Sequence, residues 1–402
     1  MYWRHLLLLV LSVTAGMAVA VGQPVPVVTF AIPDQIQIVR FIAEEDAVYA
    51  SVHYLAITGS QAPERKSALV CWKPDGRMRW QRDLPEAFQF ACAGKILALI
   101  YDDGTLAAAR GLLTIDADTG RTLTETQLDG RAAALQYYPR EHVLACIIYP
   151  QHRMETLEGA WMEVRAYTRQ GHESWRRRFE TTELTPCVMD GRLLVLSDAH
   201  ATLLRLDPAT GLLRWRQPYR AATSPSTRLP TYQTCGMLSM APTRTVAVAF
   251  DADTGVIASH FPVDLPISQY QHALATPDHL YLAITLTEGK GVLLKSFALP
   301  GGQLAWMDEW DANTDVVTPP VCWENRVAIL ARQWHDVIGG RMIGMTELRL
   351  YARDGTPLVR QTRDTSRQGY WDDTVAMQVA AHRLYLVDGR QLVALAWRTD
   401  TK

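Results

Sequence analysis

The sequence is poor in asparagine, lysine and net charge. Asparagine occurs only at positions 313 and 325, and lysine at only six positions among 402 residues. The formal net charge of −2 gives no reason to expect nucleic acid as a partner. The shortage of asparagine, a common sugar-contacting amide, disfavours a carbohydrate-binding lectin. Charged residues make up 20% and hydrophobic residues 48% of the chain, so there is material for a large core and no composition typical of disorder.

Motifs that carry chemistry are also missing. The chain has no Cys-x-x-Cys, His-Glu-x-x-His or Gly-x-Ser-x-Gly pattern and no glycine-rich phosphate loop. Two acidic pairs, Asp102-Asp103 and Asp372-Asp373, could begin a cation site, but a hard cation needs several more converging oxygen ligands. We interpret both pairs as solvated loop carboxylates. The sequence therefore predicts no catalytic residue, no cofactor and no metal site.

The first 20 residues have the pattern of an export signal. Arg4 and His5 form a basic start, Leu6 to Val13 an apolar stretch, and Ala18-Val19-Ala20 a small-residue cleavage site. We expect cleavage near Ala20 and a periplasmic or secreted protein. The apolar run is short for a membrane-spanning helix, which needs about 20 residues, although an uncleaved anchor is an alternative. No cysteine follows the apolar stretch to accept a lipid, and we expect no integral membrane span after signal removal.

A glycine turn followed four residues later by tryptophan recurs along the chain. The complete copies are Gly76 with Trp80, Gly171 with Trp175, Gly211 with Trp215 and Gly302 with Trp306, and the turn without tryptophan recurs at Gly120, Gly255 and Gly355. The spacing of these glycines, about 40–50 residues, is typical of propeller blades. We expect each tryptophan ring to fold back over the neighbouring strand and seal the edge of its blade, which gives all these residues a structural role.

The strand pattern within the repeats supports this interpretation. The clearest repeat has strands at Leu184–Met189, Arg192–Ser197, Thr202–Asp207 and Leu212–Gln217. An eighth repeat has only three, at Val375–Ala380, Arg383–Val387 and Gln391–Trp397. We expect the β-branched segment Pro26–Ala31 to supply its fourth strand. The sequence thus predicts an all-β, eight-bladed β-propeller of four-stranded antiparallel blades, with a signal peptide at 1–20 and a single domain at 21–402.

Four of the six cysteines fall early in their repeats, at positions 92, 187, 235 and 322. A free cysteine behaves as a small, readily buried apolar residue, so their use at an equivalent early strand is interpreted as packing. A disulfide between Cys187 and Cys235 in neighbouring blades is the alternative, because an exported compartment permits disulfides.

One repeat carries a family resemblance. The segment from Leu206 to Trp215, Leu-Asp-Pro-Ala-Thr-Gly-Leu-Leu-Arg-Trp, resembles the repeat of pyrroloquinoline-quinone-type propellers, as does the stretch from Thr185 to Val195 before it. The resemblance covers essentially the whole mature chain and implies an eight-bladed propeller. Quinoprotein dehydrogenases of this family pair two adjacent cysteines and bind calcium through Glu, Asn and Asp, and no adjacent cysteine pair occurs here. The chain is more similar to the non-enzymatic branch that includes the propeller lipoprotein of the outer-membrane barrel-assembly machinery.

The candidate partner-binding residues come from propeller geometry. Loops that join the second and third strands emerge on one face of a propeller, and Tyr149–Trp161 and Gln333–Met345 are long insertions there. The candidates in these insertions are His152, Arg153, Trp161, Trp334, His335 and Arg341. Long loops on a rigid scaffold commonly bind partners, and tryptophan and arginine are favoured at interaction hot spots. The alternative is that these loops only cap the central channel.

Together these observations predict an exported, non-catalytic β-propeller scaffold that mediates protein-protein interaction in the cell envelope. We expect a monomer or a subunit of a hetero-complex with one or more envelope proteins. The alternative is a quinone-dependent or sugar-directed periplasmic enzyme that uses the mouth of the channel.

Overall fold

The structure is a computed structural model. It describes residues 23–30, 32, 36–56, 64–84, 87–92, 94–102, 110–150, 162–179, 184–189, 192–197, 202–218, 231–232, 235–241, 244–251, 253–263, 268–286, 291–310, 314–337, 341–364, 375–388 and 391–398. Within these ranges the chain forms strands and connecting turns, and no helix occurs. The strands form antiparallel sheets, which we number 1 to 8 in chain order.

The first four sheets each have four strands. Sheet 1 contains β2 (Ile36–Ala43), β3 (Val48–Ala56), β4 (Glu64–Trp72) and β5 (Met78–Leu84). Sheet 2 contains β6 (Ala87–Cys92), β7 (Ile96–Asp102), β8 (Arg110–Asp116) and β9 (Thr122–Gln127). Sheet 3 contains β10 (Gly130–Tyr138), β11 (Val143–Pro150), β12 (Met162–Thr168) and β13 (Glu173–Phe179). Sheet 4 contains β14 (Leu184–Met189), β15 (Arg192–Ser197), β16 (Thr202–Leu206) and β17 (Leu213–Pro218).

The last four sheets follow the same plan, with one extra strand in sheet 7. Sheet 5 contains β18 (Thr231–Tyr232), β19 (Cys235–Ala241), β20 (Arg244–Phe250) and β21 (Ile257–Val263). Sheet 6 contains β22 (Ser268–Ala275), β23 (His279–Leu286), β24 (Val292–Ala298) and β25 (Gln303–Trp310). Sheet 7 contains β26 (Thr314–Val317), β27 (Val321–Trp323), β28 (Arg326–Val337), β29 (Arg341–Ala352) and β30 (Pro357–Asp364). Sheet 8 contains β31 (Val375–Ala380), β32 (Arg383–Asp388), β33 (Leu392–Arg398) and β1 (Gln23–Phe30).

The N-terminal strand β1 joins the C-terminal sheet. It pairs antiparallel with β33, from Gln23 opposite Arg398 to Phe30 opposite Leu392. Phe30 also packs edge-on against Trp72 of sheet 1, with ring centroids 6.1 Å apart. The backbone groups of β33 that face β1 are therefore hydrogen-bonded, and β1 also brings sheet 8 into contact with sheet 1.

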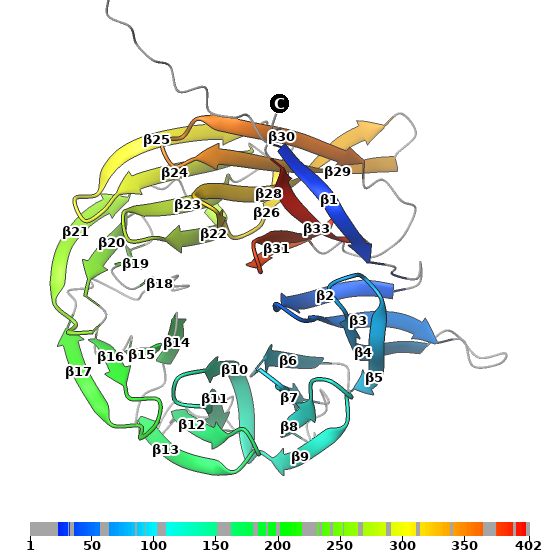
Figure 1. Cartoon of the computed structure of the whole chain (residues 1–402). Coiled ribbons are helices and arrows are strands. Elements are labelled where there is room, and N and C mark those ends of the chain that lie inside the picture. The colour runs from blue at the N-terminus through cyan, green and yellow to red at the C-terminus, as the bar shows by residue number, and fades with distance from the viewer. Residues whose placement is uncertain are drawn as a thin grey trace, which may run out of the picture.

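The core lies between successive sheets. The sheets follow one another around a common centre (Figure 1), and each hydrophobic cluster draws residues from two neighbouring sheets. At the junction of sheets 2 and 3, for example, Ala98 and Leu112 pack with Leu144 and Tyr167. Almost all residues of β23 are buried, because neighbouring sheets cover this strand on both faces.

The predicted position of the cysteines is wrong in one case. Cys235 begins β19, the second strand of its sheet, because the first strand, β18, has only two residues. Cys92 and Cys322 are only partly buried, whereas Cys71 and Cys146 are fully buried. Burial raises the pKa of both the Cys71 and Cys146 thiols to about 12, so these two cysteines are packing residues.

Candidate functional site

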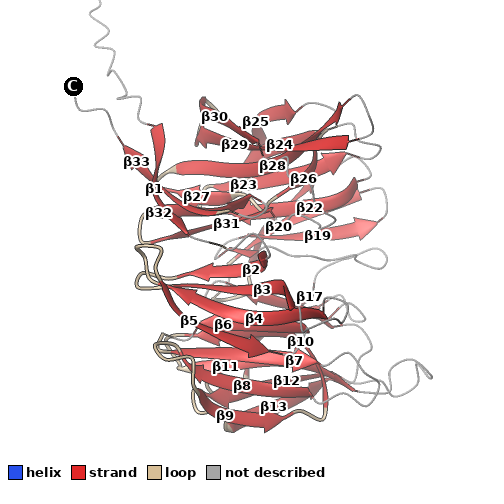
Figure 2. Ribbon diagram, turned by 90° about the vertical axis from the view of Figure 1, so that its right-hand side faces the viewer, coloured by secondary structure: helices blue, strands red, loops and turns tan. Residues whose placement is uncertain are grey.

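Two faces of the molecule are defined by their connections. On the first, the turn face, glycine turns join the third strand to the fourth in sheets 1 to 7; on the second, the hairpin face, the second strand is joined to the third. Described turns, drawn in tan in Figure 2, lie along one side of the molecule. The two faces differ in construction and therefore in the function that each can carry.

The turn face is built from a contact between sheets. Gly211 has a φ of +70°, and a Cβ placed there would lie 2.5 Å from Cε3 of Trp175 in the preceding sheet. The Trp175 indole N–H donates to the Pro208 carbonyl of the same turn at 2.8 Å. Corresponding contacts join Trp80 to Gly120, Trp215 to Gly255 and Trp306 to Gly355. Each ring thus lies between two sheets: the Trp306 centroid, for example, is 6.0 Å from that of Tyr281 in its own sheet and 5.3 Å from that of Tyr351 in the next.

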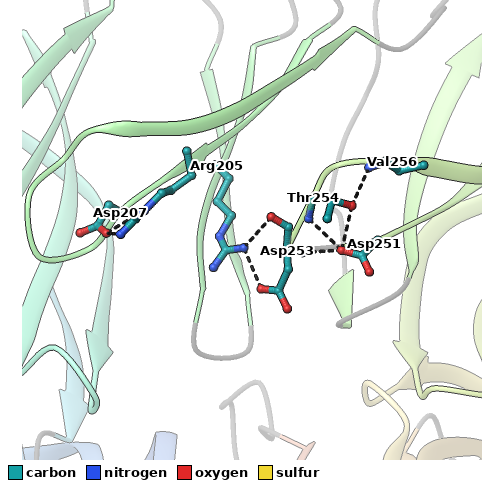
Figure 3. A network of polar contacts seen from close by, with 7 residues as sticks. Arg205, Asp207, Asp251, Asp253, Thr254 and Val256 are labelled. Carbon is teal, nitrogen blue, oxygen red and sulfur yellow. Dashed lines mark hydrogen bonds and ion pairs between the residues drawn. The ribbon is translucent and has the colours of Figure 1, made fainter.

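Figure 3 shows the polar part of such a contact between sheets 4 and 5. Arg205 Nη1 donates to the Asp253 carbonyl oxygen at 3.1 Å and to its Oδ1 at 2.7 Å. Within the second turn, Asp251 Oδ1 accepts the backbone N–H groups of Asp253 and Thr254, both at 2.8 Å. The Thr254 N–H is the main cause that holds the pKa of Asp251 below its usual range. These carboxylates are thus used in holding turns together.

No candidate metal centre emerges in the part of the chain that the structure describes. There, no three His, Cys, Asp or Glu side chains come close enough together to hold a metal ion. The three carboxylates labelled in Figure 3, Asp207, Asp251 and Asp253, each have partners on the protein itself.

The hairpin face carries the predicted partner residues. His152, Arg153 and Trp161 lie outside the described residues. Trp334 and His335 lie in β28, and Arg341 lies in β29, so three of the predicted positions share one hairpin. The prediction that Gln333–Met345 is a loop is wrong for its flanks, since Trp334 pairs with Gly344 and Val337 with Arg341.

The β28–β29 hairpin is longer than its sheet. Each of its strands has 12 residues. Within the described residues, pairing with β26 ends at Gln333 and pairing with β30 ends at Met345. The last four residues of β28 and the first four of β29 therefore form a two-stranded ribbon beyond the sheet. The sequence signal that could have predicted it is Gly339-Gly340, a hairpin-turn pair between the two strands.

A buried ionic network lies at the base of this ribbon. Glu347 of β29, whose side chain is 1% exposed, accepts from Nε of Arg349 at 2.5 Å and from Nε of Arg360 at 2.6 Å. Arg349 Nη1 also donates to Asp308 of sheet 6 at 2.8 Å, and its guanidinium lies 4.0 Å from the Trp310 ring centroid. Glu347 and Arg349 are the buried members of this network, and burying their charges is unfavourable unless each is paired, as both are here. The network joins β29 both to its own sheet and to sheet 6.

Sheet 3 contains the same arrangement. Glu163-Val-Arg165-Ala-Tyr167 of β12 repeats the pattern of Glu347-Leu-Arg349-Leu-Tyr351 in β29. Arg165 Nη2 contacts Glu163 Oε2 at 2.5 Å and its Nη1 contacts Asp129 Oδ1, also at 2.5 Å. The hydrogen bond from Arg165 lowers the pKa of the Asp129 carboxyl. Both copies follow the long insertions of the hairpin face, in sheets on opposite sides of the molecule in Figure 1.

Antiparallel sheets of four main strands around a common centre, with a repeated glycine turn between the third and fourth strands, define a β-propeller. A family model described as outer membrane protein assembly factor BamB matches residues 162–388, more than half of the chain. The chain therefore belongs to this family of PQQ-like propellers. No curated protein matches the sequence at a significant level.

Solved structures share the fold. BamB from Moraxella catarrhalis is 15% identical, with a TM-score of 0.56, and the match covers 94% of this chain and 99% of that one. Sqt1 from Saccharomyces cerevisiae is 10% identical, with a TM-score of 0.52 and coverage of 94% and 100%. At these identities the likeness concerns the fold. Within the described residues, no helix has the length and apolar character needed to cross a membrane.

Proposed function

We propose that this protein is a non-catalytic scaffold of the cell envelope, an eight-bladed propeller closed by β1, which binds one or more envelope proteins through its hairpin face. The family model and the match to BamB support a role as a subunit of an envelope complex. The protein is then a monomer or one subunit of a hetero-complex. The observation that carries the proposal is the β28–β29 ribbon, which extends beyond its sheet on a braced base.

The ionic network at that base suits a rigid binding element. An isolated two-stranded ribbon is marginally stable in water. Here β29 is fixed by Glu347, which is bonded to Arg360 of β30, and by Arg349, which contacts Asp308 of sheet 6. A ribbon held in one orientation loses less conformational freedom on binding, and a preorganised surface binds more tightly for that reason.

The domain organisation and location follow from the same proposal. Residues 1–20 act as the export signal and residues 21–402 form one propeller domain, which works in the periplasm or after secretion. Cell fractionation and N-terminal sequencing of the isolated protein test this part. Recovery from the cytoplasm with Met1 retained would contradict it.

Site-specific photocrosslinking in intact envelopes tests the binding face. A photoreactive residue at position 334 or 341, on the ribbon, should crosslink an envelope protein that mass spectrometry identifies. The control is position 123 on the turn face, where Leu123 is 48% exposed. Equal crosslinking at 123, or none at 334 and 341, would contradict the proposed face.

The partner should then depend on the ribbon residues in solution. We expect the double variant Trp334→Ala/Arg341→Ala to lose the crosslinked partner in a pull-down with purified proteins. The matched control, Arg121→Ala/Leu123→Ala, removes an exposed arginine and an exposed apolar residue from the turn face. Retention of the partner by the ribbon variant would remove Trp334 and Arg341 from the interface.

A further inference from the structure

Exposed aliphatic residues gather where the turn face meets the outer strands. We call five of them the rim: Met78, Leu123, Leu212, Val256 and Leu304. Their side chains are between 48% and 66% exposed. Each lies within three residues after a turn glycine, in sheets 1, 2, 4, 5 and 6. Single exposed aliphatic residues are ordinary on a protein surface, but their repetition at one place in five sheets needs an explanation.

Several charges beside the rim are paired within the protein. Arg77 contacts Asp75 at 2.6 Å next to Met78, and Arg79 contacts Asp118 at 2.8 Å. Arg205 Nη1 and Asp253 Oδ1, the pair shown in Figure 3, are 2.7 Å apart, and Asp253 belongs to the turn that precedes Val256. Pairing within the protein reduces the net charge that this surface presents to a partner. The rim itself presents exposed aliphatic side chains.

The apolar N-terminal segment is attached to the same face. Third strands run toward the turn face, because the glycine turns follow them, and β33 is the third strand of sheet 8. Gln23 pairs with Arg398 at the end of β33, so the start of β1 lies at the turn face. Figure 2 shows β1 and β33 on the side of the molecule that carries the tan turns. The apolar stretch Leu6–Val13 therefore precedes a strand that begins there.

From these two observations we propose that the turn face rests on a lipid bilayer, with the rim side chains inserted among the lipid headgroups. The export segment delivers the chain to a membrane at this face, and the rim keeps the face there. Aliphatic side chains without a surplus of basic residues insert through buried apolar area, so binding does not require anionic lipid. The hairpin face then points away from the membrane, toward soluble domains of its partners.

Vesicle flotation of residues 21–402 tests the rim apart from the leader. This form contains every described strand and lacks the membrane affinity of the apolar segment itself. We expect it to float with phosphatidylcholine vesicles, with little change when phosphatidylglycerol or salt is added. The rim variant Leu212→Gln/Val256→Gln should lower the vesicle-bound fraction by about tenfold, because two largely exposed aliphatic side chains are lost.

The control variant is Val39→Gln/Met307→Gln. Its residues are 41% and 57% exposed; Val39 lies within β2, and Met307 lies in β25 five residues after Gly302. It should float like the unchanged protein, and thermal unfolding should show that both variants are folded. The proposal is overturned if residues 21–402 do not float, or if the two variants lose binding equally. The proposal is also overturned if the protein does not float and sedimentation shows a dimer that the rim variant abolishes. The rim would then bind a second copy of this chain.

Discussion

The contact between Trp175 and Gly211 makes a quantitative prediction. Alanine at position 211 must adopt a φ of +70°, and its Cβ would lie 2.5 Å from the Trp175 ring. Gly94 has almost the same φ, +68°, with no atom within 4 Å of a Cβ placed there. Both positions require a positive φ, but only position 211 lacks space for a Cβ. Comparing the two alanine variants therefore separates the cost of the backbone conformation from the cost of the steric contact.

The two alanine variants should lose different amounts of unfolding free energy, because only Gly211→Ala overpacks the Trp175 ring. A left-handed conformation costs a non-glycine residue about 1–2 kcal/mol, and this applies to Gly94→Ala and Gly211→Ala alike. Carbon atoms prefer separations of about 3.5–4.0 Å, so the Trp175 ring must move by about 1 Å in Gly211→Ala. Overpacking of this kind adds about 1–3 kcal/mol. We therefore expect Gly211→Ala to cost about 2 kcal/mol more than Gly94→Ala.

Equilibrium urea unfolding of the two variants measures this difference. A third background, Trp175→Ala, removes the ring, and in it Gly211→Ala should cost no more than Gly94→Ala does. Equal destabilisation of the two alanine variants in the unchanged protein would refute the reasoning, because it would mean that the ring does not need the glycine. Persistence of the full cost in the Trp175→Ala background would refute it as well.

Three further predictions concern charge, acid and thiols. Glu347→Gln removes the buried charge that pairs with two arginines and should lower the unfolding free energy by about 3 kcal/mol. The control, Glu173→Gln, removes an exposed pair and should lower it by less than about 1 kcal/mol, and calorimetry measures both values. Because the folded-state pKa of Asp251 is depressed, its stabilisation is present above the unfolded value and is lost as pH falls through the folded value below 3.8; Asp251→Asn should weaken this acid dependence in thermal unfolding scans. Native protein should resist alkylation at Cys71 and Cys146, and the denatured chain should expose all six thiols, or two fewer if a disulfide is present.

The repeat and many strands could be predicted from the sequence because their signals are local. Alternation, short apolar runs and turn residues predict β14, β15 and β31 with the bounds observed. The pairing of β1 with β33 was also predictable, since a repeat with three strands needs a fourth. The positions of the turns between third and fourth strands could be predicted because they need a residue with positive φ. Glycine adopts this conformation without strain, as Gly211 does.

The candidate site was predicted less well for a physical reason. The pattern of Glu, Arg and Tyr at 163–167 recurs at 347–351 and was visible in the sequence, but charged residues are usually exposed, so its burial was not expected. The length of the insertion at 333–345 predicts a loop, whereas the pair Gly339-Gly340 is typical of a hairpin turn, which agrees with the observed pairing of β28 and β29. The role of Trp334 and Arg341 in binding stays a prediction.

The sequence by itself determined the repeat, its strands and the glycines of its turns, because each depends on backbone conformation and on neighbours a few residues away. Only the tertiary structure decided what those residues touch. The tryptophan of one repeat packs on the glycine of the next, and Arg349 reaches Asp308 across a sheet boundary. Such contacts depend on how the sheets pack face to face, since burial of apolar area drives this packing and brings together side chains far apart in the chain.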